Sequence, residues 1–153
     1  MENTLSTTTD KVFLYDVIGA QFDTIGSKAL AVKKMLNDYF PKNDYLRRLG
    51  VCVFEAEANL AIHTIHGGSI EVMIFSDRVR ITAKDDGPGM KDMKKALTPG
   101  FSTAPESARQ LGFGGGVGLN NIKRFADYFY IESSKKGTTL IFEVWNDDDP
   151  TTH

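Results

Sequence analysis

Glycine makes up five of the seven residues from Gly112 to Gly118, and a helical pattern begins directly after this run. Glycine loses more conformational entropy on folding than any other residue, so a run this dense is tolerated where the backbone must approach something closely or stay mobile. A phosphate chain is the natural candidate, because loop N–H groups and the N-terminus of a following helix together attract an anion. A flexible linker is the alternative, since a glycine-rich pattern alone is a weak signal.

The composition predicts one soluble domain over residues 11–146, between a polar tail at 1–10 and an acidic tail at 147–153 that are both expected to be disordered. The net charge is -2 and no basic run is left unbalanced, which argues against nucleic acid as a partner. No apolar stretch is long enough to span a bilayer, and the N-terminus lacks the pattern of a signal peptide. The single cysteine, Cys52, excludes an internal disulfide. We therefore expect a cytoplasmic protein without a membrane partner.

Hydrophobic periodicity predicts an α+β fold: a two-layer sandwich of a largely antiparallel mixed sheet of about five strands, with three main helices on one face. The expected strands are residues 12–18, 69–77, 78–84, 127–134 and 138–145. The expected helices are residues 22–40, a helix from 43 or 44 to the Gly67-Gly68 stop, and 117–127, with a short helix at 90–97. The long segment 98–116, between the short helix and the helix at 117–127, has little apolar content and is expected to be a functional loop or lid.

Three polar residues of the second helix, Glu55, Asn59 and His63, are spaced four residues apart. This spacing puts them on one stripe of an otherwise mostly apolar helix. A carboxylate and a carboxamide there are costly unless they meet water, a metal or a ligand, although an exposed polar stripe is the simpler alternative. His63 also suits a cation at the helix C-terminus or a satisfied histidine.

The sequence Asp85-Asp86-Gly87-Pro88-Gly89 directly follows a predicted strand. These residue types suit an ordinary strand-ending turn. They also suit the base of a pocket, in which the Asp85 carboxylate accepts a hydrogen bond from an exocyclic amine and the glycines let a flat ring approach the backbone. Such an acceptor would select adenine over guanine.

These motifs occur in one order along the chain: Glu55-x-x-x-Asn59, then 85–89, then 114–119, then the Gly-Thr-Thr sequence at 137–139. The order resembles the N box, the two glycine boxes and the terminal Gly-Thr pair of the GHKL superfamily of ATP-binding domains. The resemblance covers roughly residues 12–145, and it implies the Bergerat-type ATP-binding fold of that superfamily.

Within the superfamily, the short chain is most similar to the small bacterial serine/threonine kinases that act as anti-sigma factors or as switch kinases. Gyrase, mismatch-repair and chaperone members carry further domains, and histidine kinases need a helix bearing the phosphorylated histidine. The sequences GFST at 100–103 and DDGPGM at 85–90 resemble the switch-kinase branch, whose substrates are small STAS-domain proteins. The segment 104–117 is longer and richer in glycine than in that branch, which leaves substrate choice open.

The resemblance implies ATP and Mg²⁺ as cofactors, with Glu55 as the catalytic residue that orients and deprotonates a Ser or Thr hydroxyl. It implies that Asn59 is a ligand of the Mg²⁺ that bridges the phosphates. The other nucleotide contacts that it implies are Asp85, Gly87, Gly89, Gly114, Gly116, Val117, Gly118, Leu119, Thr138 and Thr139, with Ser102, Thr103 and Arg109 as candidate lid contacts. Positioning and charge neutralisation dominate phosphoryl transfer, so such a set could suffice.

Two functions stay open at this point. In the first, the protein phosphorylates a small regulatory partner of STAS type or an anti-sigma antagonist. In the second, it is a nucleotide-dependent module that binds a sigma factor with little or no kinase activity. Glu55 favours the first, because pure binding requires no base there. The partner's identity, the phosphorylated residue, the regulatory signal and the oligomeric state, a homodimer included, are left open by the sequence.

Overall fold

The structure, a computed structural model, describes residues 11–19, 23–64, 66–87 and 118–146. Both expected tails, the expected short helix at 90–97 and the expected lid lie outside these residues. The elements are, in chain order, β1 (Lys11–Val17), α1 (Ser27–Leu36), α2 (Asn43–His63), β2 (Gly68–Ile74), β3 (Arg78–Lys84), α5 (Gly118–Phe125), β4 (Tyr128–Ser134) and β5 (Gly137–Trp145).

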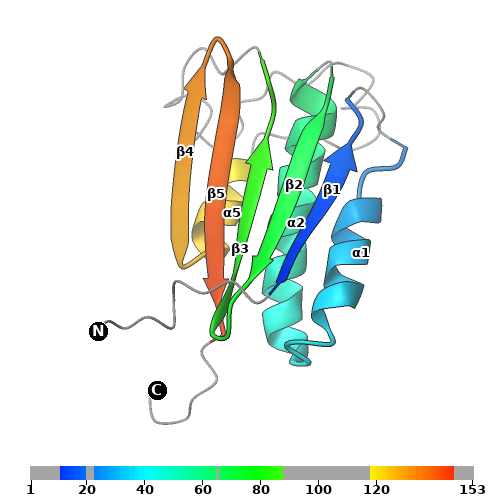
Figure 1. The fold of residues 1–153 in the computed structure, drawn as a ribbon, viewed down its shortest axis with the longest axis vertical. Helices are drawn as coiled ribbons and strands as arrows, with labels where there is room; N and C mark the ends of the chain where they lie inside the picture. The colour runs from blue at the N-terminus through cyan, green and yellow to red at the C-terminus, as the bar shows by residue number, and fades with distance from the viewer. Residues whose placement is uncertain (1–10, 20–22, 65, 88–117, 147–153) are drawn as a thin grey trace.

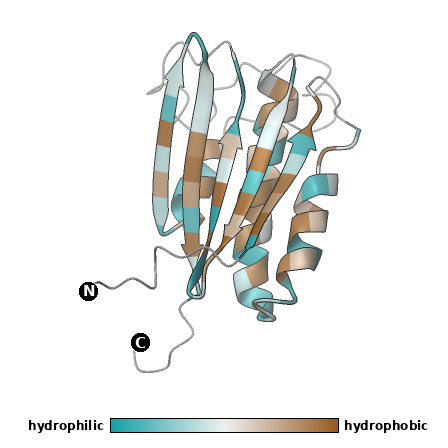
Figure 2. Ribbon diagram, in the orientation of Figure 1, coloured by the Kyte–Doolittle hydropathy of each residue, from teal (hydrophilic) through white to brown (hydrophobic). Residues whose placement is uncertain are grey.

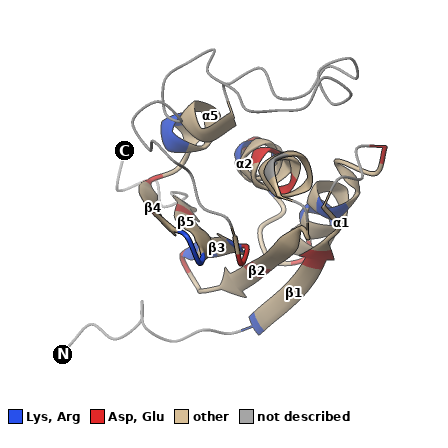
Figure 3. Ribbon diagram, turned by 90° about the horizontal axis from the view of Figure 1, so that it is seen from above, with Lys and Arg blue, Asp and Glu red and all other residues tan. Residues whose placement is uncertain are grey.

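The five strands form one sheet in the order β1-β2-β3-β5-β4 (Figure 1). All four pairings in the described sheet are antiparallel. The three helices that the structure describes lie on one face of the sheet, as the view from above shows (Figure 3). The expected α+β fold, with about five strands and three main helices on one face, is confirmed.

The hydrophobic core lies between the sheet and the helices. Alternate residues of β3, namely Val79, Ile81 and Ala83, are buried and face the helix layer, and β2 and β5 repeat this pattern. Hydrophobic segments accordingly recur along these middle strands and along the helices (Figure 2). Burial of one face per strand fixes the register, because a slip by one residue would turn every side chain to the other face.

The first helix is shorter than the predicted range of 22–40, since α1 begins at Ser27 and ends at Leu36. Gly26, the residue before it, has a φ of 105°, which is a left-handed conformation that prevents the helix from extending toward residue 22. Gly26 has no side chain to cap α1. Glu57 of α2 takes this role, because its carboxylate accepts hydrogen bonds from the N–H groups of Lys28 (3.2 Å) and Ala29 (2.9 Å).

The second helix begins at Asn43, as predicted, but ends at His63 rather than continuing to the Gly67-Gly68 pair. Thr64 is extended, and its hydroxyl donates to the Leu60 carbonyl (2.6 Å) and accepts from the Gly67 N–H (2.7 Å). Gly67 and Gly68 therefore do not end the helix; they allow neighbouring backbone to pack closely against them. A Cβ at Gly67 would lie 1.8 Å from the Val17 carbonyl oxygen, so β2 could not start beside β1 with a larger residue there.

Among the described residues, no helix is both long and apolar enough to cross a membrane.

Candidate functional site

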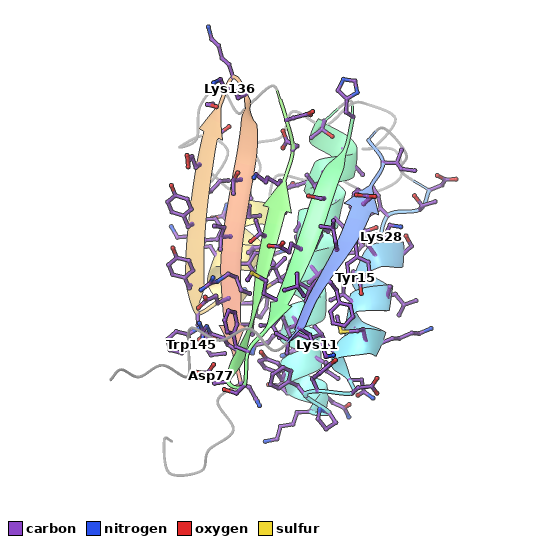
Figure 4. All side chains as sticks on the ribbon, viewed as in Figure 1. Lys11, Tyr15, Lys28, Asp77, Lys136 and Trp145 are labelled. Atoms are coloured by element: carbon purple, nitrogen blue, oxygen red, sulfur yellow. The ribbon has the colours of Figure 1, made fainter. Side chains whose placement is uncertain are left out.

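The candidate residues that the structure describes lie in two contacts: the end of β3 against the turn between β4 and β5 at one end of the molecule, and the later turns of α2 against the start of α5. Lys136, in the turn between β4 and β5, marks that end of the molecule in Figure 4, and Asp77 and Trp145 mark the opposite one. Each of the two contacts brings together motifs that are far apart in the sequence.

Glu55 and Asn59 face the N-terminus of α5. A Cβ built on Gly118 would lie 3.1 Å from Glu55 Oε1 and 3.6 Å from Asn59 Oδ1, so the helix backbone comes close to both side chains. Both polar side chains are half-buried, which agrees with the prediction that they share one stripe. The side chain of His63 lies outside what the structure describes.

Asn121 is part of this cluster, and sequence reasoning missed it. Its side-chain Nδ2 donates a hydrogen bond of 3.0 Å to Glu55 Oε2. Asn121 follows Gly118 by three residues, so the two positions lie on the same side of α5. That spacing was the available signal, but it says nothing of which residue of α2 would be opposite.

Asp85 lies at the end of β3 against the turn between β4 and β5. Its backbone N–H donates to the Thr138 carbonyl (3.1 Å), and its Oδ1 accepts from the Gly87 N–H (2.9 Å). Gly137 makes this contact possible, because a Cβ there would lie 2.1 Å from the Asp85 carbonyl oxygen and its φ is 141°. Asp85 continues the alternation of β3 residues that face the helices, which directs its side chain toward the helix layer.

Burial raises the pKa of the Asp85 carboxyl above its ordinary value. The N–H groups of Gly87 and Thr138 act in the opposite direction, and the neighbouring Asp86 charge adds to the increase. A half-buried carboxylate with two backbone donors is a single, oriented acceptor, which is the property that recognition of an exocyclic amine requires.

The two threonines after Gly137 point in different directions. Thr138 is buried on the helix-covered face, where its hydroxyl shares a hydrogen bond of 2.8 Å with Ser133. Thr139 is opposite Lys84 and Glu132 in the ladder, and the alternation turns its side chain to the uncovered face. The structure therefore brings Thr138 to Asp85 but not the side chain of Thr139.

Leu119 is buried in the core, so its backbone amide, not its side chain, is what α5 offers to a ligand. The remaining candidates lie outside the described residues: Gly89, Ser102, Thr103, Arg109, Gly114, Gly116 and Val117.

The donor set fits a nucleotide with a divalent cation. The start of α5 supplies N–H groups and the positive end of its dipole for phosphate oxygens, and the absence of a side chain on Gly118 leaves room beside it. The Glu55 carboxylate beside a phosphate calls for a cation between them, and Asn59 Oδ1 is a suitable ligand. Mg²⁺ is commonly held by few protein oxygens together with phosphates and water, so a single carboxamide oxygen is a chemically suitable protein ligand for it.

Comparison with known proteins gives a family and several relatives. Residues 45–148 match the family of histidine kinase-, DNA gyrase B-, and HSP90-like ATPases. An anti-sigma F factor of Oceanobacillus iheyensis is 31% identical over 117 residues, which cover 72% of this chain and 77% of that protein. An anti-sigma F factor of Geobacillus stearothermophilus is 34% identical over 106 residues, which cover 65% and 69%.

A solved structure, the catalytic domain of the histidine kinase ThkA, is similar with 14% identity and a TM-score of 0.48, over 89% of this chain and 98% of that one.

Proposed function

Because the chain belongs to the family of histidine kinase-, DNA gyrase B-, and HSP90-like ATPases, we propose that it is a Mg·ATP-dependent serine/threonine protein kinase of a bacterial partner-switching module. Membership of this family implies an ATP-binding domain. The Ser or Thr acceptor, the Mg²⁺, the STAS-type or anti-sigma-antagonist substrate and the cytoplasmic location are parts of the proposal.

The observation that carries this proposal is the contact of Gly118 with Glu55 and Asn59. It puts a helix N-terminus, a carboxamide oxygen and a carboxylate side by side, which supports their proposed roles as phosphate site, Mg²⁺ ligand and proton acceptor in phosphoryl transfer to a hydroxyl. Asp85, whose Oδ1 accepts a hydrogen bond from the Gly87 N–H, is the proposed adenine acceptor.

Each residue then has one role. Asp85 would accept a hydrogen bond from the adenine amine, the first N–H groups of α5 would bind phosphate oxygens, and Asn59 Oδ1 would hold the Mg²⁺. When bound, ATP would supply the phosphoryl group and the Mg²⁺ would neutralise part of the charge on the phosphates. Glu55 accepts the proton of the Ser or Thr hydroxyl while that oxygen bonds to the γ-phosphorus and the bond to the bridging oxygen breaks, which leaves ADP.

The names of the relatives favour a second candidate function. Both are anti-sigma F factors, so a nucleotide-dependent anti-sigma module with little or no kinase activity is the alternative. In that case the same pocket would control whether a sigma factor is bound.

One experiment distinguishes the two functions. The protein is immobilised and incubated with a lysate of its source organism in Mg·ATP or in Mg·ADP, and the captured proteins are analysed for phosphopeptides by mass spectrometry. A partner phosphorylated on Ser or Thr with the parent, but not with Glu55→Gln, supports the kinase. Nucleotide-dependent capture of a sigma factor without any phosphopeptide supports the binding module. Capture that is the same in both nucleotides, again without a phosphopeptide, contradicts both.

A further inference from the structure

The helices α2 and α5 run antiparallel and are joined by polar contacts at two points. Near the start of α5, Asn121 Nδ2 donates to Glu55 Oε2 (3.0 Å). At its end, Arg48 Nη1 donates to the Phe125 carbonyl (3.3 Å). Arg48 and Glu55 are seven residues apart on α2, and Gly118, Asn121 and Phe125 lie on one side of α5, so both contacts belong to the same helix interface.

The charges of this interface match the dipole of α5. The Glu55 carboxylate lies near the positive N-terminal end of α5, and the Arg48 guanidinium lies at the negative C-terminal end. The two contacts therefore fix how far α5 is advanced along α2. As a result, the position of Glu55 relative to the start of α5 is set by the protein itself.

The hydrogen bond from Asn121 distinguishes the two oxygens of Glu55. Oε2 is tied to the amide, whereas Oε1 lies on the side of Gly118. An untethered glutamate side chain would rotate among several rotamers and would lose conformational entropy on being ordered. Asn121 removes part of that freedom before any ligand arrives.

We infer that Asn121 is a positioning residue, which holds Glu55 through Oε2 so that Oε1 is presented to the acceptor hydroxyl beside the N-terminus of α5. This inference rests on the proposed kinase function. In the transfer step the hydroxyl oxygen bonds to the γ-phosphorus, the bond to the bridging oxygen breaks to leave ADP, and the hydroxyl proton moves to Glu55 Oε1. Asn121 neither gives nor takes a proton.

The first test follows the contact without any activity. The side-chain amide of Asn121 is observed by ¹H–¹⁵N NMR in the nucleotide-free protein and in Glu55→Ala. We expect its amide protons to be shifted downfield and slow to exchange in the parent, and to move to the ordinary range in the variant. Identical amide resonances in the two proteins would overturn the inference, whether or not the protein is a kinase.

The second test compares substitutions at position 121 by transfer from radiolabelled ATP to the phosphorylated partner. Asn121→Ala should lower kcat by about 10- to 100-fold, the cost of a mispositioned catalytic group, while KM for ATP stays unchanged. Asn121→Asp, which has the same shape but places a second carboxylate at Glu55, should be at least as slow. Asn121→Gln, which keeps an amide donor, should recover part of the rate.

Two controls keep this result interpretable. Calorimetric binding of Mg·ADP should be unchanged in all three variants, which verifies the fold and the pocket. Lys123→Ala, an exposed substitution on the same helix, should leave every quantity at the parent value. A parent-like kcat in Asn121→Ala, or equal rates for the Gln and Asp variants, would overturn the positioning role. No transfer by the parent to any protein would reject the proposed function, and the NMR test would still decide whether Asn121 holds Glu55.

Discussion

At the scale of single residues, Asp85 shows how a binding role and stability can oppose each other. Burial raises the pKa of its carboxyl, which means that the folded protein disfavours the charged form. The stabilising effect of Asp85 is present at low pH and is lost as the pH rises through the raised pKa. At neutral pH the ionised carboxylate is therefore a cost to the fold, which is explicable if it is retained for a ligand.

We predict that Asp85→Asn weakens ATP binding by about 5- to 150-fold, because the amide can turn an N–H toward the adenine amine and leave a donor unpaired at a cost of about 1 to 3 kcal/mol. Isothermal calorimetry with ATP and with GTP measures this. At neutral pH, the free energy of unfolding of the nucleotide-free variant, measured in urea, should not be lower than that of the parent. As the pH rises from 4 to 7, the stability of the variant relative to the parent should increase. ATP affinity equal to that of the parent would remove Asp85 from adenine recognition.

Residue types and spacing predicted part of the geometry of the candidate site. The four-residue spacing of Glu55 and Asn59 was enough to place both on one side of a helix, and the structure brings both to Gly118. Asn121 was missed because its importance depends on which residue of α2 lies opposite, and that is a tertiary contact between positions 66 residues apart in the sequence. For Thr139, a motif match could not tell which face of the strand it occupies.

At the scale of elements, α1 depends on a residue of another helix. Glu57 is 2% exposed, and its carboxylate binds the N–H groups of Lys28 and Ala29, which no residue of the Gly26 turn caps. Glu57 lies 29 positions after Lys28 and 28 positions after Ala29 in the sequence, so the local pattern that predicted a helix over 22–40 could not include this contact. Helix periodicity indicated that α1 exists, whereas its start was decided by Gly26 and Glu57.

We predict that Glu57→Ala lowers the free energy of unfolding by about 1 to 3 kcal/mol, because it leaves the half-buried N–H of Lys28 and the buried N–H of Ala29 without their acceptor. Urea denaturation followed by circular dichroism measures the change. The matched control is Asp38→Ala, which deletes an exposed carboxylate in the turn after α1. Binding of Mg·ATP to the folded variant should be retained, since Glu57 faces α1 and not α5. Unchanged stability would show that solvent satisfies the start of α1.

At the scale of the whole molecule, the alternating strands and the three helices were enough to predict two layers. The strand order was not predictable in the same way, because the insertion of β5 between β3 and β4 is set by long-range pairing. That order matters for function, since it brings the end of β3, with Asp85, to the turn before β5, with Gly137.

The whole-molecule activity is predicted to separate into binding and chemistry through two residues on one helix. Asn59→Ala should remove most of the difference between ATP affinity with Mg²⁺ and with a chelator, because it deletes an oxygen ligand of a cation that prefers octahedral oxygen coordination. Glu55→Gln should keep nucleotide and partner binding, because the substitution preserves the size of the side chain. The lost carboxylate is proposed to act on the incoming hydroxyl and not on ATP.

The chemistry should nevertheless be slower by about 10² to 10⁴ in Glu55→Gln, the usual contribution of a general base, or about 3 to 5 kcal/mol of barrier. Calorimetry and transfer of radiolabel from ATP to the captured partner measure the two effects side by side. Asp16→Asn, the same carboxyl-to-amide change at an exposed position of β1, should behave as the parent in both. A parent rate of transfer in Glu55→Gln would contradict the catalytic role of Glu55, and loss of ATP binding in it would mean that this carboxylate serves the nucleotide and not the acceptor.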